Sequence, residues 1–248
     1  MSEKSPPVFF LPAAAWREPL ELLGPEAAHA ARVLRLAPGD NLRLIDGEGR
    51  TGLCRIDRVD KNRLRLRLIE ERRVSPPATR LHLAPAFSKS ARRGYLIEKA
   101  AELGAFGLIF WKAARSQGDM PEAPKDSWLA QAAAGAKQSA NAFVPRLETA
   151  PSLEALIARA QGFDARFAAL EPAYGAAAPT PGDLLRPGDA ILVLGPEGGL
   201  TRTEAETLVK AGFAPLSLGP NVLRLETAAL AALSLWHWAR AQPEPGHP

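Results

Sequence analysis

Two glycine-rich turns near the C-terminal end carry the residue types best suited to hold a ligand. Gly195-Pro-Glu-Gly-Gly199 follows the apolar run 190–194, and Gly219-Pro220 follows a second apolar run at 214–218. A branched apolar run that ends in such a turn predicts a buried strand. Glycine lets the backbone approach a ligand closely. Two such turns so close in sequence predict one pocket that offers backbone N–H and C=O groups among leucines.

Several familiar chemistries are missing from these turns. The segment Gly195–Gly199 has no following Lys-Ser/Thr pair and so differs from a P-loop. The segment Gly47–Gly52 matches Gly-x-Gly-x-x-Gly, but an alternating strand follows it, which predicts a hairpin turn. Cys54 is the single cysteine, and the four histidines lack metal-ligand spacing, so we expect no metal site. An adenine ring with a short amino-acid tail would suit the predicted pocket, as would other polar ligands.

The elements that must position these turns alternate between strand and helix. This order predicts an α/β domain with a mainly parallel sheet, in which ligands bind beyond the carboxyl ends of the strands. Overlapping Thr-x-x-Glu capping boxes at 201–206 predict a helix start, and Ser152 is a candidate N-cap. The predicted strands are 80–86, 106–111, 146–149, 165–170 and 190–194, and the predicted helices are 91–103, 125–141, 152–160 and 225–241.

The N-terminal part has a different pattern. A short helix is predicted at 25–36, and strands are predicted at 41–46, 53–59 and 63–69. Period-two alternation in these strands turns leucines inward and arginines outward. The arginine-rich side is either a surface for phosphates or a solvated strand face. The prolines of 74–79 suit a linker, so we expect a β-rich domain at 1–73, a linker at 74–79 and an α/β domain at 80–248.

The composition sets broad limits on function. The 248 residues carry a formal charge of +4 and a sequence pI of about 9.5, which permits nucleic acid as a partner. No apolar stretch approaches the roughly 20 residues that span a membrane. The apolar segment 8–11 is too short for a signal peptide. These features and the single cysteine lead us to expect a cytoplasmic protein without a membrane partner.

Motifs along nearly the whole chain resemble one family, the RsmE-type 16S ribosomal RNA uridine-N3 methyltransferases of the knotted SPOUT superfamily. The two stretches that carry most of the resemblance are Leu194–Gly199 with Glu204, and Leu218–Pro220 with Leu223-Arg224 and Glu226-Thr227-Ala228. The supporting stretches are 29–35, Gly39-Asp40, Asp46-Gly47, 99–104 and Gln138-Ser139 followed by Val144-Pro145.

The resemblance implies a fold, a cofactor and partners. The fold would be a SPOUT-like α/β domain with a parallel sheet and a trefoil knot, preceded by a small PUA-like β-barrel domain. The cofactor would be S-adenosylmethionine (SAM), and the partners would be 16S rRNA or the small ribosomal subunit and a second copy of the chain in a homodimer. The implied cofactor-binding residues are Leu170, Glu171, Leu194, Gly195, Pro196, Glu197, Gly198, Gly199, Leu218, Gly219, Pro220, Leu223 and Leu225.

Catalytic and RNA-binding residues follow from the same resemblance. Arg224 would contact the base or stabilise charge, unless it forms a structural salt bridge at the helix start. Glu226 would orient an arginine or act as a base, or simply favour the helix N-terminus. Thr227 would bind the base or cap the helix. The expected RNA-binding residues are Arg32, Arg35, Lys89, Arg92 and Arg93.

Four positions depart from the family pattern. Val8, Asn141 and Asn221 stand where the family usually has arginine, and Leu225 stands where it usually has threonine. Arginines contact phosphates and base edges, so these departures bear on the RNA target more than on the cofactor. The competing hypotheses are a SPOUT methyltransferase with another RNA target, a non-catalytic RNA-binding protein of the same fold, and a nucleotide-dependent α/β enzyme.

Overall fold

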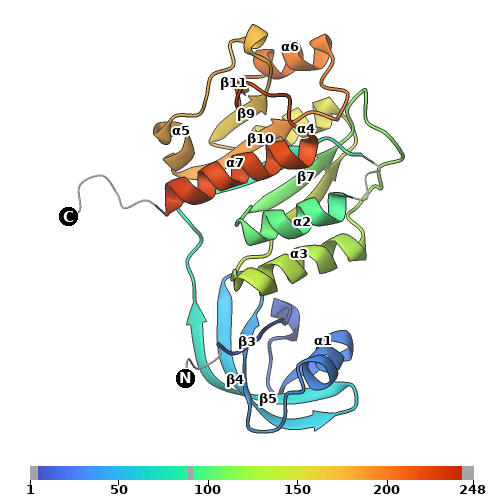
Figure 1. Ribbon diagram of the computed structural model, residues 1–248, viewed down its shortest axis with the longest axis vertical. Coiled ribbons are helices and arrows are strands. Elements are labelled where there is room, and N and C mark those ends of the chain that lie inside the picture. The colour runs from blue at the N-terminus through green and yellow to red at the C-terminus, as the bar shows by residue number, and fades with distance from the viewer. Residues whose placement is uncertain (1–4, 89–91, 242–248) are drawn as a thin grey trace, which may run out of the picture. The chain divides into compact units, whose positions relative to one another are not determined.

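The computed structural model describes residues 5–88 and 92–241, which divide into two compact units (Figure 1). Unit 1 comprises the chain up to Pro76 together with Ala133–Val144. Unit 2 comprises Pro77–Ala132 and the chain from Pro145 onward. The sequence pattern does not indicate that residues 133–144 belong with the N-terminal unit.

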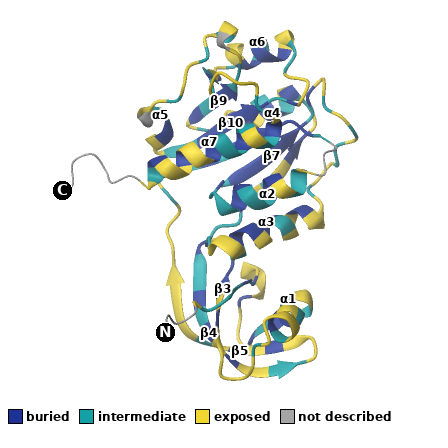
Figure 2. Cartoon of the chain, in the orientation of Figure 1, coloured by how far each residue is buried: buried dark blue, intermediate teal, exposed yellow. Residues whose placement is uncertain are grey.

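Unit 2 is built on a six-stranded parallel sheet with the order β11-β9-β10-β6-β7-β8. The central strands are apolar runs because both faces of the sheet are covered, and Figure 2 shows them largely in the dark blue of buried residues. The strands are β6 (Thr79–Pro85), β7 (Gly107–Trp111), β8 (Arg146–Ala150), β9 (Ala165–Ala169), β10 (Gly188–Leu194) and β11 (Ala214–Leu216).

Helices cover both faces of this sheet. One face packs against α4 (Leu153–Ala160) and α6 (Arg202–Lys210), whose leucines join the core that contains Trp111. On the other face, α7 (Leu225–Arg240) places the ring of Trp236 against that of Phe167, with centroids 6.0 Å apart. The remaining elements that follow β6 in the chain are the helices α2 (Arg93–Glu102), α3 (Asp126–Ser139) and α5 (Pro181–Leu185) and the 3-10 turn η3 (Pro172–Tyr174).

The predicted helix caps are confirmed in two places. The Ser152 side chain accepts a hydrogen bond from the N–H of Ala155 at the start of α4. Of the two overlapping boxes, the structure uses the first, in which Thr201 and Glu204 bond reciprocally at the start of α6. In unit 2 the predicted element boundaries differ from the observed ones by at most two residues, as is usual for fraying ends. In unit 1 the strand predicted at 53–59 begins three residues earlier, and the strand predicted at 63–69 ends four residues later.

Unit 1 contains a five-stranded sheet with the order β1-β3-β4-β5-β2. The alternation predicted for 41–69 is confirmed, because the inward leucines form a core with Phe9 and Trp16. The strands are β1 (Val8–Phe10), β2 (Leu20–Leu23), β3 (Asn41–Ile45), β4 (Arg50–Asp60) and β5 (Arg63–Arg73), and the 3-10 turn η1 spans Ala13–Ala15. The segment 46–49 joins β3 to β4, so the predicted hairpin reading is confirmed.

The helix predicted at 25–36 is wrong in its length and type. It consists of α1 (Gly24–Ala28) followed by a π-helical turn, η2 (His29–Val33). The chain then turns at Arg35, which has a φ of +55°. A π turn lets Ala30 remain buried while Val33 stays exposed, and hydrophobic spacing alone does not reveal such a turn.

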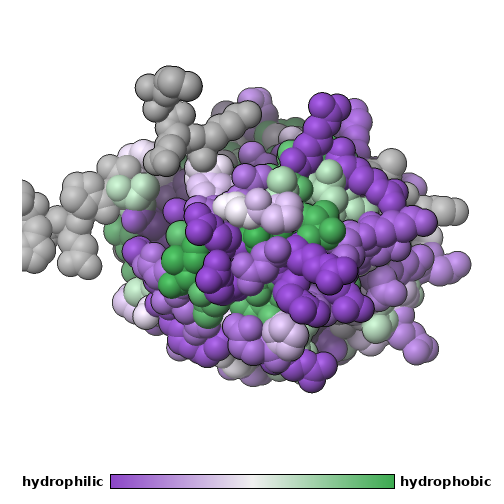
Figure 3. All heavy atoms as spheres, turned by 90° about the horizontal axis from the view of Figure 1, so that it is seen from below, coloured by the Kyte–Doolittle hydropathy of each residue, from purple (hydrophilic) through white to green (hydrophobic). Residues whose placement is uncertain are grey.

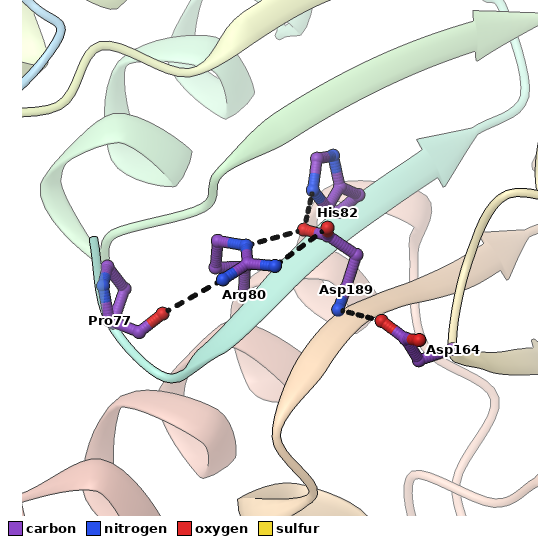
Figure 4. Close-up of polar contacts among 5 residues, drawn as sticks. All are labelled: Pro77, Arg80, His82, Asp164 and Asp189. Carbon is purple, nitrogen blue, oxygen red and sulfur yellow. Dashed lines mark hydrogen bonds and ion pairs between the residues drawn. The ribbon is translucent and has the colours of Figure 1, made fainter.

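Polar groups at the amino-terminal edge of the unit 2 sheet form a compact network (Figure 4). Asp189 accepts two hydrogen bonds from Arg80, at 2.8 and 2.9 Å, and lies 3.1 Å from Nε2 of His82. The backbone N–H of Asp189 donates to Asp164. Because Arg80 and Asp189 come from the adjacent strands β6 and β10, this network ties the two strands together where they begin.

The surface in Figure 3 is mostly hydrophilic, with a few separate hydrophobic patches. Among the described residues, no helix is long and apolar enough to cross a membrane. In the same part of the chain, no three His, Cys, Asp or Glu side chains gather in a way that could hold a metal ion.

Candidate active site

A cavity of about 300 Å³ lies where the strands β9, β10 and β11 end. These are neighbouring parallel strands, and their carboxyl ends are the usual ligand position in such sheets. We call this space the cofactor cavity. It is lined by residues 169–171, Tyr174, 194–197, Gly199, Leu200, Ala205, 216–223, Leu225 and Ala228.

The predicted cofactor residues meet at this cavity with one exception. The stretches that follow the three strands all contribute to the lining, as the paired glycine turns predicted. Gly198 is the exception, because it does not line the cavity. Its carbonyl oxygen instead accepts a hydrogen bond of 2.6 Å from Nη1 of Arg115, so Gly198 acts in holding the loop rather than in forming the wall.

The second glycine turn depends on a backbone shape that only glycine adopts readily. Gly219 has a φ of +119°, which lies in the left-handed half of backbone space. The hydroxyl of Ser217 accepts from the N–H of Gly219 and donates to its carbonyl, both at 3.3 Å. This local pairing fixes the wall between β11 and α7.

Glu204 fastens the first glycine turn to a distant loop. Its carboxylate accepts from the backbone N–H of Ala114 at 2.7 Å and from the N–H of Thr201 at 2.8 Å. Only 8% of Glu204 is exposed. A buried carboxylate that is fully hydrogen-bonded holds its neighbours rigidly, so Glu204 positions the loop without lining its reactive side.

A second, smaller hollow of about 10 Å³ adjoins the cofactor cavity at Leu225, which lines both. We call it the arginine hollow, and it is lined by Ala86, Ser88, Arg92, Arg93, Leu96, Phe110, Leu225 and Glu226. Nη1 of Arg92 donates to Oε1 of Glu226 over 2.5 Å. Three residues predicted to contact RNA or catalyse the reaction therefore gather beside the cavity.

Glu226 is ionised at neutral pH. Burial raises its pKa, but the backbone hydrogen bond at the start of α7 and the ion pair with Arg92 outweigh burial and leave the pKa below its usual value. The carboxylate is therefore a fixed negative charge and a weak base near pH 7.

Arg93 is held against two neighbouring aromatic rings. Its guanidinium lies 5.0 Å from the ring centroid of Phe87 and 4.6 Å from that of Trp128. Nη1 of Arg93 also donates to the carbonyl of Ser88 at 2.8 Å. Among the described residues, no carboxylate forms an ion pair with Arg93, and burial lowers its pKa. Such a pre-oriented cation can stabilise negative charge with little reorganisation.

The other predicted site residues lie elsewhere or outside the described residues. Arg224 is the N-cap residue of α7, and Thr227 follows in its first turn; both are exposed and line neither space. Lys89 lies outside the described residues. Arg32 and Arg35 are exposed at the π-helical turn of unit 1.

Some lining residues were not predicted from the sequence. They include Tyr174 and Ala205. Tyr174 follows β9 by five positions in a 3-10 turn that no periodic pattern announces. The one signal that could have indicated Tyr174 is its position shortly after β9, the strand that precedes the two glycine turns.

Two family models match the chain and agree with this architecture. One, described as an RNA methyltransferase domain, matches residues 75–237, and the other, described as an RNA methyltransferase PUA domain, matches residues 22–69. A parallel α/β unit with a cavity at the carboxyl ends of its strands, preceded by a PUA domain, defines the class of PUA-containing RNA methyltransferases.

Curated relatives narrow the class. The ribosomal RNA small subunit methyltransferase E of Mycobacterium bovis is 35% identical over 216 residues, covering 85% of this chain and 82% of the relative. The Bacillus subtilis protein of the same name is 32% identical over 225 residues, covering 86% and 87%. The chain belongs to the ribosomal RNA small subunit methyltransferase E (RsmE) family.

Solved structures are similar over almost the whole chain. A Legionella pneumophila methyltransferase in complex with SAM has a TM-score of 0.83 at 29% identity, covering 95% of this chain and 98% of that one. The Neisseria gonorrhoeae ribosomal RNA small subunit methyltransferase E bound to SAM has a TM-score of 0.77 at 26% identity, covering 93% and 96%.

Proposed function

We propose that the chain transfers a methyl group from SAM to N3 of a uridine in 16S rRNA of the small ribosomal subunit. One observation carries the proposal: the cofactor cavity and the arginine hollow meet at Leu225. A cofactor-sized space and a cluster of pre-oriented charges thus lie side by side. The family membership supplies the reaction class, because the relatives are named as small subunit rRNA methyltransferases.

The lining of the cofactor cavity fits SAM. Its volume of about 300 Å³ is at the lower end for small-molecule sites. Leucines offer apolar contact for an adenine ring, and the backbone at Gly195 and Gly219 can approach polar groups closely. Glu171 and Glu197 supply negative charge suited to a sulfonium and an amino group. When bound, SAM supplies an electrophilic methyl group.

The protein must make N3 of uracil a nucleophile. That nitrogen carries a proton, which passes to water, and the loss of the proton leaves negative charge on the ring. We place the base over the arginine hollow, where Arg93 is pre-oriented to stabilise that charge. Because the hollow holds about 10 Å³, the ring lies over it rather than in it. A base that is stacked in RNA must first be swung out.

We assign Glu226 the role of a positioning residue. Its lowered pKa makes it a weak general base, and its carboxylate holds the guanidinium of Arg92 at 2.5 Å. Arg92, whose side chain is 50% exposed, is the better candidate for direct contact with RNA. Arg224 at the start of α7 remains our candidate for base contact, and Thr227 remains a candidate hydrogen-bond donor.

The remaining features of the proposal concern RNA capture and assembly. Residues 1–73 would act as the PUA-like RNA-binding domain, 74–79 as the linker and 80–248 as the methyltransferase domain. Arg32 and Arg35 would contact RNA phosphates. The chain would work as a homodimer in the cytoplasm, and its C-terminal domain would contain the trefoil knot that the family resemblance implies.

A reconstituted reaction tests the proposal. Small ribosomal subunits from a strain that lacks the N3 methyl mark are incubated with the purified chain and SAM, and the nucleosides are analysed by mass spectrometry. We expect N3-methyluridine to form. A methylated nucleoside of another kind would mean a different target, to which the departures at Asn141 and Asn221 would then be relevant. If well-folded protein fails to bind SAM in calorimetry, the enzyme assignment is wrong and a non-catalytic RNA-binding role takes its place.

A further inference from the structure

The outward face of the unit 1 sheet contains a cavity of about 500 Å³ that the proposed reaction does not use. It lies over the side of the strands that faces away from the Phe9 and Trp16 core. It is lined by Val8, 43–45, 51–53, Glu70, Arg72, Val74 and 140–143. We call it the sheet cavity.

The floor of the sheet cavity is apolar. Arg43 pairs with Val8 on one side and with Leu53 on the other in the strand register. Phe143, half-buried, closes one end from the loop after α3. A strand face that was merely solvated would carry polar residues at these positions. Apolar side chains between arginines instead suit a flat, partly apolar ligand.

The rim of the sheet cavity is basic. Arg43 lines the cavity and lies opposite Leu53 on the neighbouring strand. Arg55 is two residues from Leu53 and is therefore on the same face of the sheet. Arg55 thus lies diagonally across from Arg43. Within the described part of the chain, neither arginine forms an ion pair. Neighbouring like charges on a sheet repel, and an anionic ligand would relieve that repulsion.

Several other arginines of this sheet lie near a carboxylate. Arg63 lies 3.7 Å from Glu21, Arg67 lies 3.4 Å from Asp57, and Arg72 pairs with Glu70. Arg43 and Arg55 differ from these arginines in having no carboxylate partner among the described residues.

We propose that the sheet cavity binds one unstacked nucleotide of a single-stranded segment of the RNA substrate. The base would rest against Val8, Leu53 and Phe143, while Arg43 and Arg55 would contact the adjoining phosphates. The size of the cavity is that of a small-molecule site. Bases in an RNA duplex are stacked and inaccessible, whereas bases in single strands can be splayed on to apolar and aromatic side chains. This inference rests on the proposed function for the identity of the RNA.

Fluorescence anisotropy of the full chain with a 5′-fluorescein-labelled, 12-nucleotide single-stranded RNA tests the site. We expect Arg43→Ala to weaken binding about tenfold and to lower the slope of log K against log salt by about 0.7, the value for one lost phosphate contact on a single strand. Arg63→Ala removes an equal charge from the paired end of the same face, so we expect less than about a twofold change.

Two further measurements distinguish the contribution of the cavity's shape to RNA binding from that of its positive charge. Thr51→Trp fills the cavity without removing an arginine, so binding should weaken about tenfold with an unchanged salt slope. A 4-thiouridine in the same oligonucleotide should cross-link to Leu53 or Phe143. Protection of Cys54 from Ellman's reagent checks that unit 1 of each variant is folded, because that thiol lies in the unit 1 core. If Thr51→Trp is not folded, Arg43→Ala and the cross-link test the proposal.

The proposal is overturned if Arg43→Ala binds RNA as the wild type does, or if the cross-links map outside the cavity. Unchanged RNA binding together with slower methylation of whole subunits would mean that the face contacts a ribosomal protein instead. The RNA-binding and cross-linking readouts do not require methyl transfer. A wild type that binds RNA in this way but forms no N3-methyluridine would refute the proposed function and leave the site intact.

Discussion

The guanidinium of Arg92 and the carboxylate of Glu226 meet at 2.5 Å, although 134 positions separate them in the chain. Arg92 immediately precedes α2, and Glu226 lies in the first turn of α7. Glu226 is the more buried partner, with 15% of its side chain exposed against 50% for Arg92. The ion pair therefore holds the long, flexible side chain of Arg92 against the first turn of α7, beside the cofactor cavity.

Replacing Glu226 by Gln should lower kcat for methyl transfer by roughly 10- to 100-fold, because Arg92 would lose the charge that orients it. SAM affinity should stay near the wild-type value. If Glu226 acts through Arg92, then Arg92→Ala should have a similar effect, and the double variant should be little worse than either single one. Single-turnover kinetics on small ribosomal subunits provide the measurement.

The pH profile distinguishes positioning from base catalysis at Glu226. Since its pKa lies below the usual carboxyl value, it is already ionised at pH 6, and its titration should leave no inflection between pH 6 and pH 9. An inflection in that range that Glu226→Gln removes would contradict the positioning role. The exposed pair of Arg202 and Glu206 offers a control, because Glu206→Gln should leave the rate unchanged.

The two glycine turns should differ in their tolerance of alanine. Gly219 has a φ of +119°, which alanine adopts only with strain, so Gly219→Ala should weaken SAM binding about tenfold or more, given a strain of about 1–3 kcal/mol. At Gly198 the nearest atom to a new methyl group would be Cδ of Arg115, at an ordinary 3.4 Å. Gly198→Ala is therefore the matched control and should bind SAM nearly as the wild type does. Equal losses in both variants, measured by calorimetry, would contradict this account of the turn.

Local patterns predicted the strands and the convergence of the two glycine turns on one cavity. The runs at 190–194 and 214–218 end at one edge of a parallel sheet, so their turns had to converge there. Gly198 does not line the cavity, and a glycine's spacing alone does not say whether its backbone lies beside a cavity or beside a neighbour such as Arg115. The π-helical turn after α1 was missed because an extra residue in a turn leaves the apolar spacing almost unchanged.

The sequence pattern could not predict contacts between residues that are far apart in the chain. The two rings that contact Arg93 come from distant positions, Phe87 before α2 and Trp128 in α3. The pattern marked Arg93 as basic and near the expected cleft, but only the fold shows what holds it. The sheet cavity likewise needs Phe143, which lies far from the strands of unit 1 in sequence.

The single thiol should be unreactive in the folded chain. Burial first, and then the charge of Glu18, raise the pKa of Cys54 to about 12. The thiolate is the reactive form, so Ellman's reagent at pH 8 should label Cys54 only as unit 1 opens. The labelling rate should rise to that of a free thiol in urea. Fast labelling without denaturant would contradict the buried position of Cys54 in the core.

The network around Asp189 should make unit 2 less stable in acid. Hydrogen bonds from Arg80 are the largest cause of the lowered pKa of Asp189, so its contribution to stability is present above its unfolded pKa and is lost as the pH falls through the folded value. Burial is the largest cause of the lowered pKa of His82. Because the unfolded chain then binds that proton more readily, stability also declines as the pH falls below about 6.5, the unperturbed histidine value.

Asp189→Asn should therefore destabilise unit 2 by about 2 kcal/mol at pH 7, since charged hydrogen bonds to Arg80 are lost. Urea unfolding followed by tryptophan fluorescence measures the difference. The gap between variant and wild type should narrow towards pH 3, because the wild-type carboxyl then becomes protonated too. Glu206→Gln, which breaks an exposed pair on α6, should cost less than about 0.5 kcal/mol at either pH. A gap for Asp189→Asn that stayed constant from pH 7 to pH 3 would show that packing, rather than the charge of Asp189, joins β6 to β10.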